Sequence, residues 1–196
     1  MDDSVIRAMA RWPNVPAVFG YLALDARGRW LLNGRPLDHE QTVNFINRNY
    51  GHDDHGRWYF QNGPQRVYIA LACTPWVYRL RDDRLDTHTG VVAGTVSAAW
   101  LDEQGRLLLY TDQGIGLLHD QDLPEAVDRL TDLNGNRMDE EQVLNALEQL
   151  HSGGADLYLH LGTAPVPLAS IRSDSLAARF HFQPQPTPQP EEIGER

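Results

Sequence analysis

The sequence uses one short pattern twice. Residues 24–32 and residues 101–109 each contain an apolar run, a four-residue turn signal that ends in glycine, and a second apolar run. Turns of this composition connect antiparallel strands, because glycine adopts backbone angles that other residues avoid. Each stretch is therefore predicted to form a β-hairpin, and the 77-residue offset between them predicts that a whole unit is duplicated.

Two later matches follow in the same order. A helix at residues 38–50, where Asp38 and Gln41 have capping-box spacing, matches residues 139–150. An apolar strand at residues 66–75 matches residues 157–165, and the strand at residues 58–60 has no partner in the second copy. The predicted fold class is α+β: two tandem repeats, each a curled antiparallel β-sheet with one packed helix.

The turn and linker signals divide the chain into five parts. These are residues 1–16, an N-terminal helix and connector; residues 17–80, the first repeat (hairpin, helix, hairpin); residues 81–92, a polar connector; residues 93–172, the second repeat with an insertion at 114–137; and residues 183–196, a flexible tail rich in Pro, Gln and Glu. Features that differ between the copies are expected to carry the function, since a shared scaffold needs only to fold.

All 17 basic residues are arginine. The absence of lysine excludes Schiff-base and pyridoxal-phosphate chemistry and the phosphate-binding lysines of P-loop proteins and kinases. No dinucleotide, nucleophile-elbow, zinc-protease or Cys-x-x-Cys motif occurs, and no cofactor is predicted.

Charge is unevenly distributed along the chain. Residues 1–85 carry 11 arginines against 9 acidic residues, whereas residues 86–196 carry 6 against 18. An acidic protein lacks the basic face that phosphate contacts require, so no nucleic-acid binding is predicted. The charge difference between the halves is compatible with head-to-tail or symmetric self-association, and a homodimer is one candidate assembly.

The predicted location is the cytoplasm. No apolar run approaches the roughly 18 residues of a membrane helix, so no membrane association is expected. The acidic N-terminus is not followed by the apolar stretch of a signal peptide. The single cysteine, Cys73, excludes an internal disulfide and is predicted to be a buried, inert thiol.

Two clusters have the composition of metal sites. His52, Asp53, Asp54 and His55 place two imidazoles and two carboxylates in four residues, a ligand set that suits zinc or manganese. The alternative is a polar turn in front of Arg57, and this is the favoured interpretation. Residues 132–140 begin like a calcium loop but lack the glycine and the final glutamate, which favours an ordinary turn before a helix.

The most distinctive patch is the hairpin turn at residues 61–66 with the aromatic residues around it. Amide, guanidinium and aromatic groups together suit an anionic or planar small ligand or a peptide. The alternative is that the aromatic residues only fill the core of the sheet. The candidate ligand-binding residues are Trp58, Asn62, Gln65, Arg66 and Trp76.

Several short segments also occur in a characteristic order: residues 28–30, 33–36, a helix with Val43 and Phe45, residues 54–59 and residues 74–76. In this order the chain resembles a family of proteobacterial domains of unknown function built from two repeated hairpin–helix–strand motifs. The resemblance implies a small bacterial protein with a role in signalling and with curled sheets that each pack a helix. It supplies no catalytic residues.

Two functions from different classes follow. The first is a non-catalytic binding or signalling module for a small molecule or a protein, favoured because no catalytic constellation is present. The second is a metal-dependent hydrolase that uses the cluster at residues 52–55 together with a distant ligand. Whether the protein is an enzyme is left open, with the binding module preferred.

Overall fold

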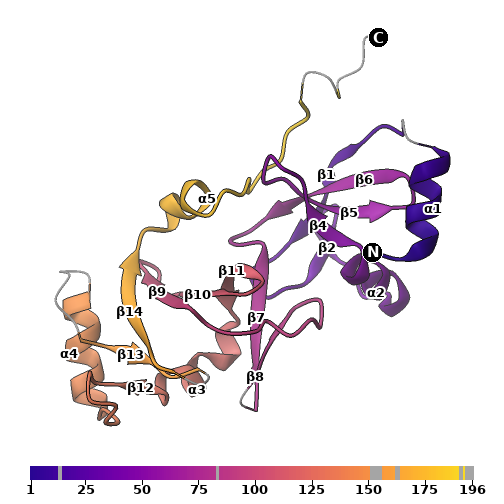
Figure 1. Ribbon diagram of the computed structural model, residues 1–196. Helices are drawn as coiled ribbons and strands as arrows, with labels where there is room; N and C mark the ends of the chain where they lie inside the picture. The colour runs from indigo at the N-terminus through magenta and orange to yellow at the C-terminus, as the bar shows by residue number, and fades with distance from the viewer. Residues whose placement is uncertain (13–14, 83, 151–155, 162–163, 190–191, 193–196) are drawn as a thin grey trace. The chain divides into compact units, whose positions relative to one another are not determined.

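The chain folds into two units (Figure 1). The computed structural model describes residues 1–12, 15–82, 84–150, 156–161, 164–189 and 192. The first unit combines Met1–Pro75 with Ala177–Arg196, and the second is Trp76–Leu176. None of the helices in the described residues is long and apolar enough to cross a membrane.

The first unit contains one sheet and two helices. In chain order its elements are α1 (Asp3–Arg11), β1 (Val18–Leu24), β2 (Trp30–Leu32), β3 (Arg35–Pro36), α2 (Glu40–Arg48), β4 (Tyr50–His52), β5 (Trp58–Asn62) and β6 (Gln65–Leu71). The sheet has the strand order β3-β2-β1-β6-β5-β4. The C-terminal part of the chain returns to this unit after the second unit is complete.

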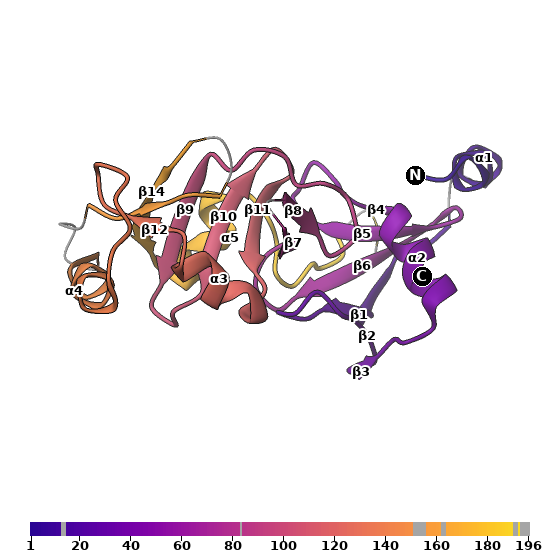
Figure 2. The same ribbon diagram turned by 90° about the horizontal axis from the view of Figure 1, so that it is seen from below.

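The second unit is built on an eight-stranded sheet with the order β12-β13-β14-β9-β10-β11-β7-β8. Figure 2 shows α4 next to β12 at one end of this sheet. The elements are β7 (Trp76–Arg81), β8 (Arg84–Thr87), β9 (Ala98–Asp102), β10 (Leu107–Thr111), β11 (Gly114–Leu118), η1 (Asp120–Asp122), α3 (Leu123–Val127), β12 (Leu130–Thr131), α4 (Glu140–Leu150), β13 (Tyr158–Leu159), β14 (Val166–Ile171), η2 (Ser173–Ser175) and α5 (Leu176–Arg179), which begins at the unit's last residue.

The predicted α+β class with two sheets is confirmed, but the sheets are mixed rather than wholly antiparallel. β1 pairs in parallel with β6, and β9 pairs in parallel with β14. The path β3-β2-β1-β6-β5-β4 of the first unit has a counterpart with the same sequence of pairings, β11-β10-β9-β14-β13-β12, in the second. Parallel pairs need a long connection, and residues 25–64 supply it between β1 and β6.

This topology corrects the predicted match between the last strands. β6 corresponds in position to β14, because each of them pairs in parallel with the first strand of its hairpin. The strand at residues 158–159, which the sequence pattern matches with β6, lies where β5 lies in the first unit. The second unit therefore has a strand in the position that residues 58–60 occupy in the first. Similar apolar strings are misleading here because composition does not reveal a strand's pairing partner.

The unit boundary differs from the one expected from composition. The chain passes to the second unit at Trp76 rather than near residue 81, and β8 lies within the segment predicted as a connector. Within the predicted tail, Gln183, Pro184, Thr187 and Glu192 make hydrogen bonds with Gly56, Leu71 and Arg57 of the first unit. Parts of the predicted connectors and tail, at 13–14, 83, 190–191 and 193–196, lie outside the described residues.

Helix α2 packs on the first sheet by its apolar face. Ile46 is buried, which is worth about 1.5–3 kcal/mol for a side chain of this size. Phe45 meets Phe60 of β5 edge to face at 5.6 Å, and Trp30 of β2 donates a hydrogen bond to Asn47. The N-cap is His39, whose ring nitrogen accepts from the backbone of Thr42, and not Asp38 as the spacing suggests.

One local turn recurs four times, at residues 25–29, 53–57, 102–106 and 132–136. In each, the first residue is aspartate and the fourth is glycine with a positive φ. One carboxylate oxygen accepts from the backbone N–H groups two and four residues on, and the other accepts from the fifth side chain. We call these the Asp–Gly turns. Their contacts lie within five residues, so the sequence alone specifies them.

Replacing Asp102 by alanine is expected to destabilise the second unit by about 1–3 kcal/mol, because three hydrogen bonds lose an acceptor that is only 1% exposed. Urea unfolding measures the loss. The matched control is Asp132→Ala, which removes the same contacts in an exposed turn and should have a smaller effect. Equal losses would show that burial does not strengthen this turn.

Candidate functional site

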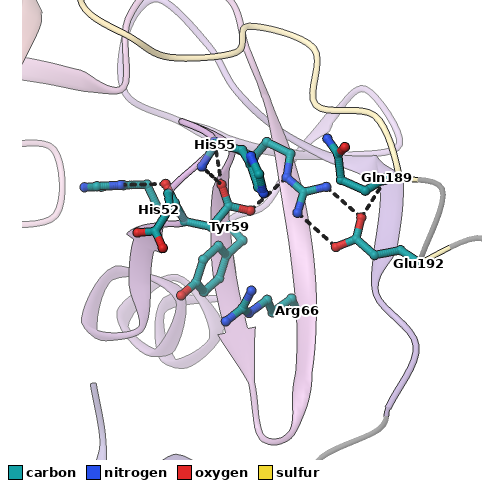
Figure 3. A pocket seen from close by; sticks show the side chains of 9 residues that line it. His52, His55, Tyr59, Arg66, Gln189 and Glu192 are labelled. Carbon is teal, nitrogen blue, oxygen red and sulfur yellow. Dashed lines mark hydrogen bonds and ion pairs between the residues drawn. The ribbon is translucent and has the colours of Figure 1, made fainter.

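A cavity of about 360 Å³ opens beside the second Asp–Gly turn of the first unit (Figure 3). It lies where β4 and β5 meet and where the C-terminal segment passes over them. The residues that line it are His52, Asp53, Asp54, His55, Arg57, Tyr59, Arg66, Gln189 and Glu192. Charged groups that are far apart in the sequence thus share one concave site, and small-ligand sites are usually concave.

Arg57 is held at the base of the cavity by groups on one side of its guanidinium. Its Nε donates to Asp53 at 2.8 Å as part of the turn, and its Nη2 donates to the Tyr68 hydroxyl at 2.9 Å. The guanidinium carbon also lies 4.5 Å from the centre of the Tyr68 ring. The Tyr68 hydroxyl donates in turn to Asp53 at 3.0 Å. With the C-terminal segment in place, only 3% of the Arg57 side chain is exposed, and the contacts with Asp53 and Tyr68 fix its orientation independently of that segment.

The outer edge of Arg57 binds a carboxylate from the C-terminal segment. Nη1 donates to Glu192 at 2.6 Å and Nη2 donates to the other oxygen at 2.9 Å, a two-point pair. Nη1 also donates to the backbone carbonyl of Thr187 at 3.2 Å. Paired N–H groups that face two carboxylate oxygens give both strength and directional selectivity. The site can therefore recognise a planar carboxylate.

The pKa shifts of Arg57 and Glu192 keep both groups charged at neutral pH. Hydrogen bonds from Arg57 lower the pKa of Glu192, and the same contacts raise the pKa of Arg57 above its usual value. Burial alone would raise the pKa of Asp53, but hydrogen bonds from the backbone and side chain of Arg57 outweigh it and lower that pKa. Burial raises the pKa of Tyr68 to about 12, so its hydroxyl stays protonated and remains a donor.

A second cation lies in the same cavity. The guanidinium of Arg66, on β6, is stacked over the ring of Tyr59 at 4.7 Å. Arg57 and Arg66 formally balance Asp53 and Asp54, so without Glu192 the lining is neutral apart from its histidines. The lining therefore attracts an anion through the direction of the arginine donors rather than through net charge.

The C-terminal segment is attached near the cavity by backbone contacts. The N–H of Gln183 donates to the carbonyl of Gly56 at 2.9 Å, and the N–H of Leu71 donates to the carbonyl of Pro184 at 2.8 Å. The Gln183 side chain donates to the carbonyl of His55, and Phe182 is buried. We call residues 182–184 the anchor. It places the residues that follow within reach of Arg57.

The predicted ligand-binding residues are dispersed. Of the five, Arg66 lines the cavity. Trp58 is buried against Tyr50 and His52, and Asn62 is exposed in the β5–β6 turn.

Gln65 donates to the backbone carbonyl of Pro16, and Trp76 begins β7 of the second unit, where its indole donates to the carbonyl of Gln113. The structure therefore brings only Arg66 to the site, together with residues that belong to the metal hypothesis.

The four residues of the metal hypothesis all line the cavity, but the Asp53 carboxylate already accepts hydrogen bonds from the backbone of His55, from Arg57 and from Tyr68. His52 contacts the backbone carbonyl of Asp53 through a ring nitrogen. Within the part of the chain that the structure describes, no group of three or more His, Cys, Asp or Glu side chains is arranged to hold a metal ion.

Outside the cavity, Cys73 is half-buried, not fully buried as predicted.

Sequence reasoning missed Arg57, Gln189 and Glu192. A signal for Arg57 is present, because residues 53–57 repeat the Asp-x-x-Gly-Arg string found at residues 25–29 and 102–106. That string identifies the turn but not the use of the arginine. No local signal indicates Gln189 or Glu192, which meet the cavity only through the return of the chain.

Fold and site together define an α+β protein with two mixed sheets and a buried arginine whose outer edge binds a carboxylate. The chain belongs to the DUF2944 family, described as "Protein of unknown function (DUF2946)", whose sequence profile matches residues 1–187. The resemblance to a family of unknown function is confirmed at this level. A comparison with curated proteins gave no match.

Two solved structures are similar. A DUF1285 family protein from Silicibacter pomeroyi DSS-3 has a TM-score of 0.51 and 13% identity, covering 81% of this chain and 85% of that chain. A DUF1285 family protein from Shewanella baltica OS155 has a TM-score of 0.41 and 15% identity, covering 57% of this chain and 90% of that chain. The first comparison supports the fold, and a shared fold does not transfer a site.

Proposed function

We propose that the first unit is a non-catalytic binding module that recognises carboxylate groups at Arg57. The observation that carries the proposal is that different groups orient the Arg57 guanidinium and occupy its binding edge. Asp53 and Tyr68 hold it in place, while its two Nη atoms face a carboxylate. A group that is oriented before binding loses less conformational freedom on binding, which raises affinity for a given set of contacts.

The other Asp–Gly turns show that the turn alone does not produce such a site. Arg29 and Arg106 make the same Nε contact with their aspartates, and 59% and 26% of their side chains are exposed. Arg57 is 3% exposed with the C-terminal segment in place, and it differs from the other two arginines in its additional contacts with the hydroxyl and ring of Tyr68. An enclosed arginine binds an anion with little competition from water, whereas an exposed pair contributes little.

A binding role also fits the use of Asp53. Its carboxylate is committed to the turn and to Tyr68, and this favours a binding module over a metal-dependent hydrolase at residues 52–55. The shared strand order of the two units supports the further proposal that they arose by duplication. In this view the second unit kept the scaffold, and the first acquired the cavity.

The test is binding of glutarate, a five-carbon dicarboxylic acid, to the Glu192→Gln chain, in which the resident carboxylate is removed. At ten times the dissociation constant, a ligand adds about 1.4 kcal/mol, or roughly 3–6 °C in Tm for a protein of this size. This increase should vanish when Arg57→Lys is added and should persist when Arg29→Lys is added instead. An increase that does not depend on Arg57, or none at all, would refute the proposal.

A further inference from the structure

The C-terminal segment is attached in two ways that differ in strength. The anchor, residues 182–184, combines the buried ring of Phe182 with backbone hydrogen bonds to Gly56 and Leu71. Beyond it, Thr187 and Glu192 reach the first unit through polar contacts with Arg57 and Tyr68, and Gln189 lines the cavity. We call Thr187, Gln189 and Glu192 the plug residues.

We infer that the plug residues occupy, within the same chain, the site of an external acidic peptide, and that such a peptide binds by displacing them. The inference rests on the proposed function and names its ligand class. The site then has two states: one closed by the chain's own glutamate and one in which a glutamate of a partner protein pairs with Arg57. Both states use the same donors, so they exclude one another.

The contacts favour a peptide over a small acid. Arg57 binds a backbone carbonyl, that of Thr187, as well as the Glu192 carboxylate. The carboxylate is itself presented by the segment, because the N–H of Gln189 donates to Glu192 at 2.8 Å and the N–H of Glu192 donates to the carbonyl of Gln189 at 2.9 Å. A side chain and a main-chain acceptor at a set spacing are features that only a peptide offers.

The same contacts make the plug residues displaceable. Glu192 remains 26% exposed in its side chain, and Thr187 is exposed. The three residues bring no large apolar side chain to the cavity, so the hydrophobic effect contributes little to their binding. Their advantage over an external peptide is that they belong to the same chain, since a short tether gives an effective concentration in the mM range. The anchor stays in place when they leave, because its contacts are separate.

The composition of the segment limits the cost of ordering it. Residues 184–190 contain a proline at every second position, and proline-rich chains are already extended in solution. An extended, acidic, proline-containing segment therefore loses less entropy on binding than a flexible one. A partner with these properties is the ligand that we expect.

The test measures binding of a fluorescein-labelled peptide with the sequence of residues 183–196 to the full chain. Fluorescence anisotropy is compared for the wild-type, Glu192→Gln and Glu192→Gln/Arg57→Lys proteins. If the tether supplies about ten times the dissociation constant of the plug residues, the Glu192→Gln chain should bind roughly tenfold more tightly than the wild type. The added Arg57→Lys change should abolish this binding, and a control peptide with glutamine in place of Glu192 should bind weakly to every protein.

The possible results distinguish failure of the inference from failure of the proposed function. Equal, Arg57-dependent binding to the wild-type and Glu192→Gln proteins would refute displacement while leaving the carboxylate site intact. Binding of glutarate but not of the peptide would refute the peptide ligand alone. Failure of both ligands to bind through Arg57 would refute the site itself. Equal binding of the control peptide would show that the carboxylate is not what Arg57 recognises.

Discussion

Replacing Arg57 by alanine is expected to destabilise the first unit by about 3–5 kcal/mol, the cost of breaking a buried ion pair by removing one partner. The change leaves the Asp53 carboxylate, with only 9% of its side chain exposed, without its main counter-charge. It also removes the donor to Tyr68 and both donors to Glu192. Urea unfolding gives the total loss, and hydrogen exchange of the β5 and β6 amides assigns it to the first unit.

The other Asp–Gly turns supply the control for this change. Arg29→Ala removes the same kind of Nε contact from an exposed turn, where such pairs are worth about 0–1 kcal/mol. Arg106→Ala should lie between the two, because Arg106 has intermediate exposure. If Arg57→Ala costs no more than Arg29→Ala, the cavity does not isolate Arg57 from water, and the basis of the proposed site is lost.

Replacing Gly56 by alanine is expected to detach the anchor. Gly56 has φ of +72°, which costs an L-residue about 1–2 kcal/mol. A β-carbon at this position would also meet the backbone of His181 and lie 3.0 Å from the Cα of Phe182. Because a backbone cannot rotate away as a side chain can, the anchor must move, and the buried Phe182 loses about 1.5–3 kcal/mol.

Hydrogen exchange measures this displacement directly, since the amides of Leu71 and Gln183 should lose protection when their bonds across the contact break. The matched control is Gly105→Ala. Gly105 has φ of +73° in the corresponding position of another Asp–Gly turn, and a β-carbon there would have no heavy atom within 4 Å. That change should cost only the backbone strain. Equal losses of stability for the two variants, with Leu71 still protected, would show that the anchor does not depend on Gly56.

Local features of the fold follow well from the sequence. The first hairpin forms around residues 25–28 because the aspartate and the glycine satisfy the turn by themselves. The helix at residues 140–150 begins as the capping box predicts, with Asp139 and Gln142 each accepting from the other's backbone N–H. These contacts span three or four residues, so local composition is sufficient to encode them.

Strand pairing, in contrast, does not follow from local composition. The sequence pattern matches β6 with residues 157–165, whereas pairing places β14 beside β9 as β6 lies beside β1. Period and composition mark a segment as a strand, but the partner depends on contacts with residues far away in the chain. The parallel pairs, which need the longest connections, are therefore the features that composition does not reveal.

The sequence predicts some residues of the candidate site but not that they lie together. His52 and Asp53 have the composition of metal ligands and Arg66 that of a ligand-binding residue, but nothing in the sequence joins these two hypotheses. Trp58 is a candidate for its aromatic side chain, which the structure buries beside Tyr50. An aromatic residue on a strand fits a core and a binding site equally well, and only burial distinguishes the two.

The sequence by itself determined the Asp–Gly turns, since each is completed by contacts among five neighbouring residues. It placed an arginine at the end of three of them, at 29, 57 and 106. Only the tertiary structure decided which of these arginines faces a carboxylate. Glu192 lies 135 residues from Arg57 in the chain and reaches it because the last segment returns to the first unit. The physical reason is that an arginine becomes selective when distant parts of the fold enclose it, and enclosure is not a local property.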